Sequence, residues 1–545
     1  MAAAGHAMFA RARRIFTTAR TLAMLAALIS ASCRPDGAAR PAALTRQVDG
    51  GALADAVADR DGVKAFLGIP YAAAPVGARR WKAPEPVPAW NGVRRVDAFG
   101  NSCLQGPPWR DVVLTRAPQS EDCLYLNVWT TAKSSDARQP VIVWIHGGAL
   151  LAGSGAEPRY DGAALATQGV VLVTFNYRLG AFGFFSHPLL SAESPTKHSG
   201  EYALLDQLAA LRWVQRNIAR FGGDSTNVTV AGESAGASAV GLLVASEEAR
   251  GLFQRAIAQS GSAMMTDPPI PTSAAADAAG QRLADSLGVH TLAALRALPA
   301  RDVIAMTARL GMMLDARIGG DVLSQTADAQ FAAHRQNDVP MLLGWNGDEG
   351  RLFVGQLFAT ATQPIATRLR ATFGDAAPSI QHVYDGLSDA DARAAIASDL
   401  WFRYPMWAWA RAQATTGHAP VYLALFDWAP PLPDDWYDAA LPRTPKAPLH
   451  AVDIVYAFDH LAAVPWTFAT RDTALAAQLS ASWVRFARTG DPNGAGIPRW
   501  TAYTGRDGLR MMRFGDSTTM ILEARERTYE AMGAALRRRA IAPAK

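Results

Sequence analysis

Short apolar runs alternate with longer amphipathic stretches through the middle of the chain. Residues 141–145 and 170–175 are unbroken apolar runs rich in β-branched residues, which is typical of strands covered on both faces. Residues 204–221 follow the period of an amphipathic helix. Residues 228–231 return to a strand pattern, and a helix-compatible stretch then runs through Ala245.

Three further apolar runs, at 256–258, 340–345 and 421–426, continue this alternation. It predicts an α/β protein with a mostly parallel central sheet and helices on both faces. Half of the 545 residues are hydrophobic, so the chain can bury a large core. Because no linker, charge block or repeat divides it, we expect one domain with long insertions.

The N-terminus has the pattern of a targeting segment. Four arginines precede an apolar run at 22–29, and small residues follow at 30–32. This predicts a signal peptide over about residues 1–32, a single mature domain over 33–545, and export to the periplasm or medium. Cys33 could carry a lipid anchor, and ordinary cleavage nearby is the alternative hypothesis. The run is shorter than the roughly 20 residues of a membrane span, and no later window supplies one.

Removing that segment changes the charge. Its four arginines are accompanied by no acidic residue, so the formal net charge falls from +5 to +1. A mature chain so close to neutrality gives no electrostatic support for nucleic-acid binding. The sequence leaves the oligomeric state open.

Cysteine usage fits an exported protein. With Cys33 at the signal boundary, Cys103 and Cys123 remain as a pair, and a disulfide between them is the natural assignment. On chain entropy it would contribute about 3 kcal/mol. Two separate buried thiols are the alternative.

The strongest chemical signal is the pentapeptide Gly-Glu-Ser-Ala-Gly at 232–236, between the strand pattern and the following helix. A serine at a sharp strand-to-helix turn needs small neighbours, and the turn exposes its hydroxyl at the helix N-terminus. There the helix dipole favours the negative charge that develops in acyl transfer. Ser234 is therefore a candidate nucleophile. Taken alone, the motif could equally be a turn without chemistry.

A serine nucleophile also needs donors for the oxyanion. His-Gly-Gly-Ala at 146–149 follows the strand predicted to end at residue 145, where an α/β-hydrolase places its oxyanion loop. The backbone amides of Gly148, Ala149 and Ala235 could form the hole. A Gly-rich turn with no catalytic part is the alternative.

The third requirement is a base and an acid, which in this fold follow the nucleophile in the order acid, then histidine. Glu349 lies just past a predicted strand end, and His450 follows it. Composition alone does not choose among the downstream histidines, which are His290, His334, His418, His450 and His460.

Several ordered blocks make the chain resemble the type-B carboxylesterases, which include the cholinesterases. Residues 120–128, Ser-Glu-Asp-Cys-Leu-Tyr-Leu-Asn-Val, look like that family's second signature, and 232–236 match the centre of its serine signature. Further blocks at 176–183, 205–207, 221–224, 259–262 and 489–493 follow in the family's order. The resemblance runs from about residue 45 to about residue 530.

The resemblance implies specific roles. Ser234 would be the nucleophile, His450 the general base, Glu349 the acid that orients it, and Gly148, Ala149 and Ala235 the oxyanion hole. It also implies the disulfide described above. Asp348 is the rival to Glu349, and the family's placement of the acid directly before a glycine favours Glu349.

The function expected from this resemblance is hydrolysis of small-molecule carboxylic esters through an acyl-serine intermediate. It requires neither a metal nor an organic cofactor. A hydrolase specialised for bulky natural esters, lipids or amides is one alternative. A non-catalytic, cholinesterase-like binding protein is the alternative from another class.

Overall fold

The computed structural model describes residues 45–59, 61–107, 115, 117–264, 269–312, 314–360, 362–436 and 448–541. All of them belong to one compact unit, Leu44–Lys545, which is distinct from the unit Met1–Ala43. The predicted signal peptide and Cys33 lie outside the described residues. Within the described ranges, no helix combines the length and the apolar character needed to cross a membrane.

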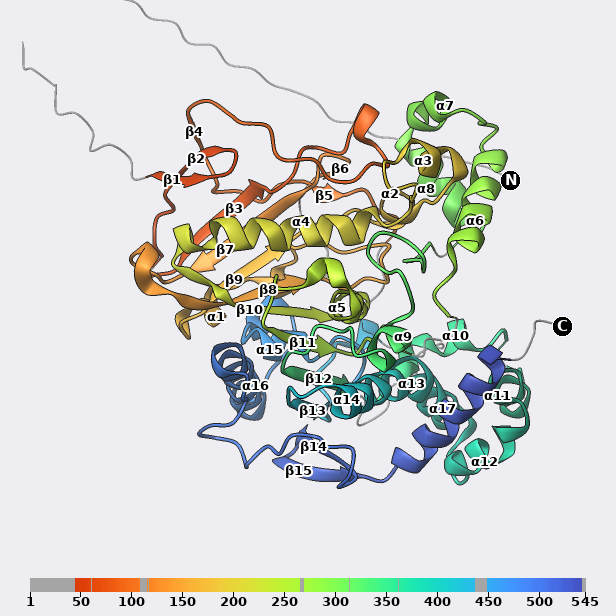
Figure 1. The fold of residues 1–545 in the computed structure, drawn as a ribbon. Helices are drawn as coiled ribbons and strands as arrows, with labels where there is room; N and C mark the ends of the chain where they lie inside the picture. The colour runs from red at the N-terminus through yellow and green to blue at the C-terminus, as the bar shows by residue number, and fades with distance from the viewer. Residues whose placement is uncertain are drawn as a thin grey trace, which may run out of the picture. The chain divides into compact units, whose positions relative to one another are not determined.

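A ten-stranded sheet forms the centre of the described unit (Figure 1). In spatial order its strands are β15 (Thr518–Glu523), β14 (Leu509–Phe514), β13 (Val421–Phe426), β12 (Met341–Asn346), β11 (Arg255–Gln259), β10 (Gly223–Glu233), β8 (Gln139–Ile145), β9 (Val171–Phe175), β7 (Tyr125–Thr130) and β3 (Lys64–Pro70). A smaller sheet contains β1 (Thr45–Val48), β2 (Gly51–Ala54) and β4 (Val93–Arg94).

Strand direction follows the predicted pattern. From β9 through β8 and β10 to β14, each pair of neighbouring strands is parallel. Within the ten-stranded sheet, antiparallel pairing is confined to β15 at one edge and to β7 and β3 at the other. The mostly parallel sheet is therefore confirmed, with antiparallel additions at both edges.

Alternate residues of β8 face two different cores, as expected for a strand covered on both sides. Val141, Val143 and Ile145 pack into one cluster, which also contains residues of α4 (Tyr202–Asn217), α5 (Ala235–Ala245), α14 (Tyr404–Thr416) and α17 (Glu526–Ile541). Ile142 and Trp144 pack into the other cluster, with α1 (Ala163–Thr167), α15 (Ile454–Ala457) and α16 (Thr470–Thr489). Helices therefore cover both faces, as predicted.

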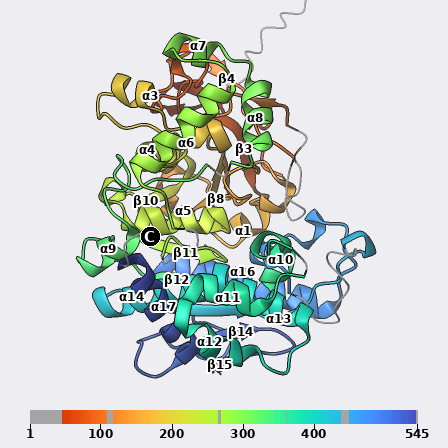
Figure 2. The same cartoon turned by 90° about the vertical axis from the view of Figure 1, so that its right-hand side faces the viewer.

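Long insertions separate the later strands. Between β11 and β12 lie α6 (Ser273–Ser286), α7 (Leu292–Ala297), α8 (Ala300–Arg309) and α9 (Ala327–Ala332). Between β12 and β13 lie α10 (Val354–Leu357), α11 (Ile365–Phe373), α12 (Ala377–Gln381), α13 (Asp389–Ser398) and α14. Figure 2 shows α11 to α14 gathered with α17 beside the C-terminal strands. In this second insertion, α11, α12 and α14 pack against α17.

Two predicted boundaries differ from the structure. The helix predicted over 204–221 is α4, which ends at Asn217 and passes into a tighter 3₁₀ turn, Ile218–Phe221. The strand predicted over 228–231 extends back to Gly223, with a shift in its register between Gly223 and Val228. Residues 224–227 are polar or partly exposed, so the apolar pattern did not reveal them as strand.

Candidate active site

Ser234 is the single residue between the end of β10 and the start of α5. Its backbone has φ 56° and ψ −125°, a conformation that strains a residue with a side chain by about 1–3 kcal/mol. Two backbone hydrogen bonds hold it there. The Ser234 amide donates to the Gln259 carbonyl at 2.8 Å, and the Ser234 carbonyl accepts from the Ser238 amide at 2.9 Å. The sequence motif therefore folds as the sharp turn that it predicted.

Glycines around this turn are required by close backbone approach. A Cβ on Gly232 would collide with the backbone of Gly236, and one on Gly236 would collide with the Ile145 carbonyl. A Cβ on Gly261 would collide with the carbonyl of Ser234 itself. The small residues thus allow the nucleophile turn to lie directly against β8 and the end of β11.

The predicted oxyanion loop lies beside Ser234. A Cβ built on Gly147 would stand 3.1 Å from the Ser234 Cβ. The loop backbone then turns through positive φ angles of 99° at Gly148, 55° at Ala149 and 61° at Leu150. Among the hydrogen bonds formed by the described residues, none uses the amide of Gly148 or Ala149 as donor. These two amides thus have no described backbone acceptor in the loop beside Ser234.

His146 fixes the start of this loop from a fully buried position. Its ring stacks on Tyr177, with ring centroids 4.3 Å apart, and the Tyr177 hydroxyl donates to the His146 carbonyl at 2.7 Å. His146 Nδ1 lies 2.9 Å from the Gly147 carbonyl oxygen, so a neutral ring can donate there. Burial lowers the pKa of His146 from 6.5 to about 4.

This buried histidine is expected to make stability fall in acid. Its pKa is lower when folded, so the unfolded chain binds the proton first, and stability declines as the pH falls from 6.5 to about 4. The shift corresponds to about 3 kcal/mol. Urea unfolding at about pH 7.5 and about pH 4.5 should show a smaller loss of unfolding free energy in His146→Gln than in wild type. Equal losses in wild type and His146→Gln would contradict this account; the exposed His418→Gln should behave as wild type.

His450 and Glu349 come together from segments 101 residues apart. His450 Nδ1 lies 2.6 Å from Glu349 Oε2, and both side chains are buried. The other carboxylate oxygen, Glu349 Oε1, accepts from the Asn346 amide at 2.6 Å. The Asn346 side chain donates to the Leu449 carbonyl at 2.8 Å, which ties the acid turn to the histidine segment.

Asp348, the rival acid, points elsewhere. Its carboxylate pairs with Arg351, which also contacts Asp391 at 2.9 Å. Burial raises the pKa of Asp348, and Arg351 opposes part of that rise. Glu349 is therefore the member of this adjacent pair that reaches a histidine.

The structure also distinguishes the candidate histidines. His450 is buried, whereas His290, His334 and His418 are exposed and His460 is half-buried. The ring of His450 packs against Phe402, with centroids 4.7 Å apart, and Phe353, at 5.1 Å, and these two rings also contact each other.

Glu233 is a site residue that the sequence did not clearly identify. Its buried carboxylate places Oε1 3.1 Å from His450 Nε2, on the opposite side of the ring from Glu349. A positive charge that developed on the ring would therefore be stabilised by two carboxylates. The signal in the sequence was an acidic residue next to the candidate nucleophile, which is equally compatible with a structural role.

Asp453 is a third buried carboxylate near the site, and it is connected to Glu349 through Asn346. Its Oδ1 accepts from the Asn346 side chain at 3.0 Å. Burial raises the pKa of Asp453 to about 6.

The predicted disulfide is also present, and it links Cys103 to Cys123.

Comparisons with known proteins identify the family of this chain. The model of the carboxylesterase family matches residues 45–532. The chain is 37% identical over 489 residues to fumonisin B1 esterase of Sphingopyxis macrogoltabida, which covers 87% of this chain and 86% of that protein. It is 36% identical over 457 residues to para-nitrobenzyl esterase of Bacillus subtilis (strain 168), and the match covers 81% of this chain and 89% of that protein.

Solved structures show the same fold. Carboxylesterase EST55 of Geobacillus stearothermophilus superposes with a TM-score of 0.77 at 33% identity, covering 90% of this chain and 99% of that chain. A PNB esterase superposes with a TM-score of 0.76 at 31% identity, covering 90% and 100%. The chain therefore belongs to the carboxylesterase family, has the α/β-hydrolase fold, and is a serine hydrolase of carboxylic esters.

Proposed function

We propose that Ser234, His450 and Glu349 form the catalytic triad of this esterase. The proposal rests on the 2.6 Å contact between His450 Nδ1 and Glu349 Oε2. This contact is buried and brings together a carboxylate and an imidazole from segments that are far apart in the sequence. With Nδ1 donating to the carboxylate, the lone pair of Nε2 can accept the serine proton. The strained turn at Ser234 supports its role as the exposed nucleophile.

The proposed reaction has two stages. Ser234 Oγ attacks the ester carbonyl while His450 takes its proton, and the amides of Gly148, Ala149 and Ala235 bind the oxyanion. The bond to the leaving alcohol then breaks as His450 returns the proton to the alcohol oxygen. Water repeats the sequence on the acyl-enzyme and releases the acid.

Glu233 has a supporting electrostatic role in this scheme. Its carboxylate lies 3.1 Å from His450 Nε2, on the side away from Glu349. The positive charge that His450 acquires during attack would therefore be shared between two carboxylates. No group in the scheme requires a metal or organic cofactor.

We infer that the substrates are small-molecule carboxylic esters, and an acyl-length series tests this. Purified mature protein should release nitrophenol from nitrophenyl acetate and butyrate. Inactivity on both, together with hydrolysis of long-chain esters or of the matched anilides, would favour the alternative hydrolases. Fumonisin B1 is a further test substrate, because one relative is named for that ester.

We also propose that the protein is exported. A disulfide and the basic, then apolar N-terminal sequence support export. Mass spectrometry of the mature N-terminus tests it. An acylated Cys33 would support the lipid anchor, an unacylated end near residue 33 would support release, and a retained Met1 would contradict export.

A further inference from the structure

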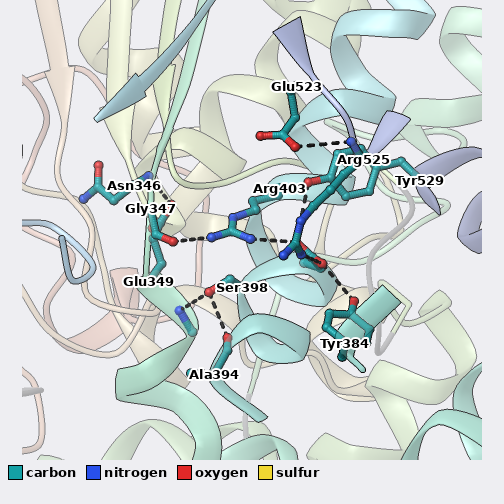
Figure 3. A network of polar contacts seen from close by, with 12 residues as sticks. Asn346, Gly347, Glu349, Tyr384, Ala394, Ser398, Arg403, Glu523, Arg525 and Tyr529 are labelled. Atoms are coloured by element: carbon teal, nitrogen blue, oxygen red, sulfur yellow. Dashed lines mark hydrogen bonds and ion pairs between the residues drawn. The ribbon is translucent and has the colours of Figure 1, made fainter. Parts of the chain in front are cut away.

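A π-helical turn, Asp399–Arg403, joins α13 to α14 immediately behind the proposed triad acid. Such turns are rare, and they occur frequently at functional sites because the extra residue redirects side chains. Figure 3 shows Arg403 and Ser398, the residue just before the turn, pointing toward the segment that carries Asn346, Gly347 and Glu349. The contacts of this turn give it a specific part in the site.

The turn and the residue just before it hold the acid segment on both sides of Glu349. The Arg403 guanidinium donates to the carbonyl of Gly347, two residues before the acid (Figure 3). Ser398 Oγ accepts from the amide of Gly350, one residue after the acid, at 2.9 Å. The same hydroxyl donates to the Ala394 carbonyl at 2.9 Å, which fixes its direction. The backbone that directs Glu349 toward His450 is thus anchored at two points.

The turn also contacts the histidine. Phe402 lies within the π-helical turn, and its ring centroid is 4.7 Å from that of His450. One short segment therefore supports both the acid and the base. A displacement of this segment would change the distance between Glu349 and His450 without altering either side chain.

Arg403 is itself held by a buried carboxylate. Asp399 is fully buried and accepts from Arg403 Nη1 at 3.0 Å and from the Tyr384 hydroxyl at 2.8 Å. It also pairs with Arg525, which lies between β15 and α17 (Figure 3). A buried carboxylate with this many partners has a fixed position, because losing any one of them leaves a desolvated charge poorly compensated. The guanidinium of Arg403 is thereby aimed at Gly347.

We propose that Arg403 is a positioning residue that links buried Asp399 to the Gly347 carbonyl and so holds Glu349 at hydrogen-bonding distance from His450. This inference rests on the proposed triad. Arg403 does not touch the reacting atoms in this scheme. Its effect on catalysis passes through the position of the acid turn.

The test compares Arg403→Met and Arg403→Lys with Arg411→Met. Arg411 is a matched control, because it lies on the adjacent α14 and pairs with Glu530 of α17 at 2.8 Å. Its side chain is more exposed than that of Arg403. All proteins are normalised to folded active sites by phosphonate titration. The readouts are kcat and KM for nitrophenyl butyrate, and the pH profile of kcat/KM.

A displacement of a catalytic group by about 1 Å can lower the reaction rate by about 100-fold. In Arg403→Met, kcat is therefore expected to fall by about 10- to 100-fold with little change in KM. The acid limb of the pH profile should move to lower pH. The carboxylates that face His450 are Glu349 and Glu233, with Asp453 further out. Of these, the turn holds only Glu349, so its displacement weakens stabilisation of the imidazolium. Arg403→Lys should recover part of kcat, and Arg411→Met should match wild type.

Unchanged kcat and an unmoved acid limb in a folded Arg403 variant would overturn the proposal, and so would a lower kcat without a shift of the limb. If Arg403→Met does not fold, Arg403→Lys decides by the same two readouts. Glu349→Gln is measured in parallel. If Glu349→Gln keeps full activity, the proposed triad has failed; if it loses activity while the Arg403 variants do not, only the positioning role has failed.

Discussion

Replacement of Ser234 by alanine is expected to reduce kcat/KM for nitrophenyl acetate by at least about 10⁴-fold, and up to about 10⁶-fold. The substitution removes the one oxygen that forms the acyl-enzyme in the proposed scheme. The oxyanion amides and the binding site remain, so a small residual rate over water is expected. Turnover is measured on purified wild type and variant, with the thermal unfolding of both as a check of folding.

Ser238→Ala is the matched control for that variant. Ser238 lies in the first turn of the same helix, α5, and its amide donates to the Ser234 carbonyl. Because alanine keeps that amide, Ser238→Ala should retain most of the activity. Substantial turnover by folded Ser234→Ala would show that another residue is the nucleophile.

Replacement of His450 by alanine is expected to cost nearly as much as loss of the serine. Without the imidazole, nothing accepts the Ser234 proton during attack or returns it to the leaving alcohol. The effects of substituting residues that act as one unit are not additive. The rate of the Ser234→Ala/His450→Ala double variant should therefore be within several-fold of the rate of either single variant. Initial rates with nitrophenyl acetate give all three values.

The exposed histidine His418 supplies the control for His450. His418→Ala should keep the wild-type rate, because its side chain lies outside the buried site. If the His450 and Ser234 losses multiplied in the double variant, the two residues would be contributing independently. That result would contradict a single proton-transfer unit.

The strands and the sharp turn at Ser234 could be predicted because they depend on local sequence. An unbroken apolar run identifies a strand buried on both faces, as in β8 and β9. The turn at Ser234 depends on neighbouring glycines, which a short motif records. The antiparallel edge strands β3 and β15 have half-buried, irregular patterns, so their strand state was not predicted.

The candidate acid and histidine were harder to identify, because only the tertiary packing of distant segments distinguishes them from neighbouring candidates. Asp348 and Glu349 are adjacent, and the direction of each side chain is set by the 3₁₀ turn that starts at Glu349. His450 is distinguished from the other downstream histidines only by where its segment packs. The support from Arg403 depends on a π-helical turn and on Arg525 near the C-terminus, which no local pattern connects.

Covalent labelling by a fluorophosphonate, read by mass spectrometry of the intact protein and of its peptides, tests the acyl-serine mechanism without any choice of ester substrate. One phosphonyl group per chain is expected, located on Ser234. Prior labelling should abolish ester hydrolysis, and Ser234→Ala should take up no label. Stoichiometric labelling of a different residue, or full esterase activity after complete labelling of Ser234, would contradict an acyl-serine mechanism at this site.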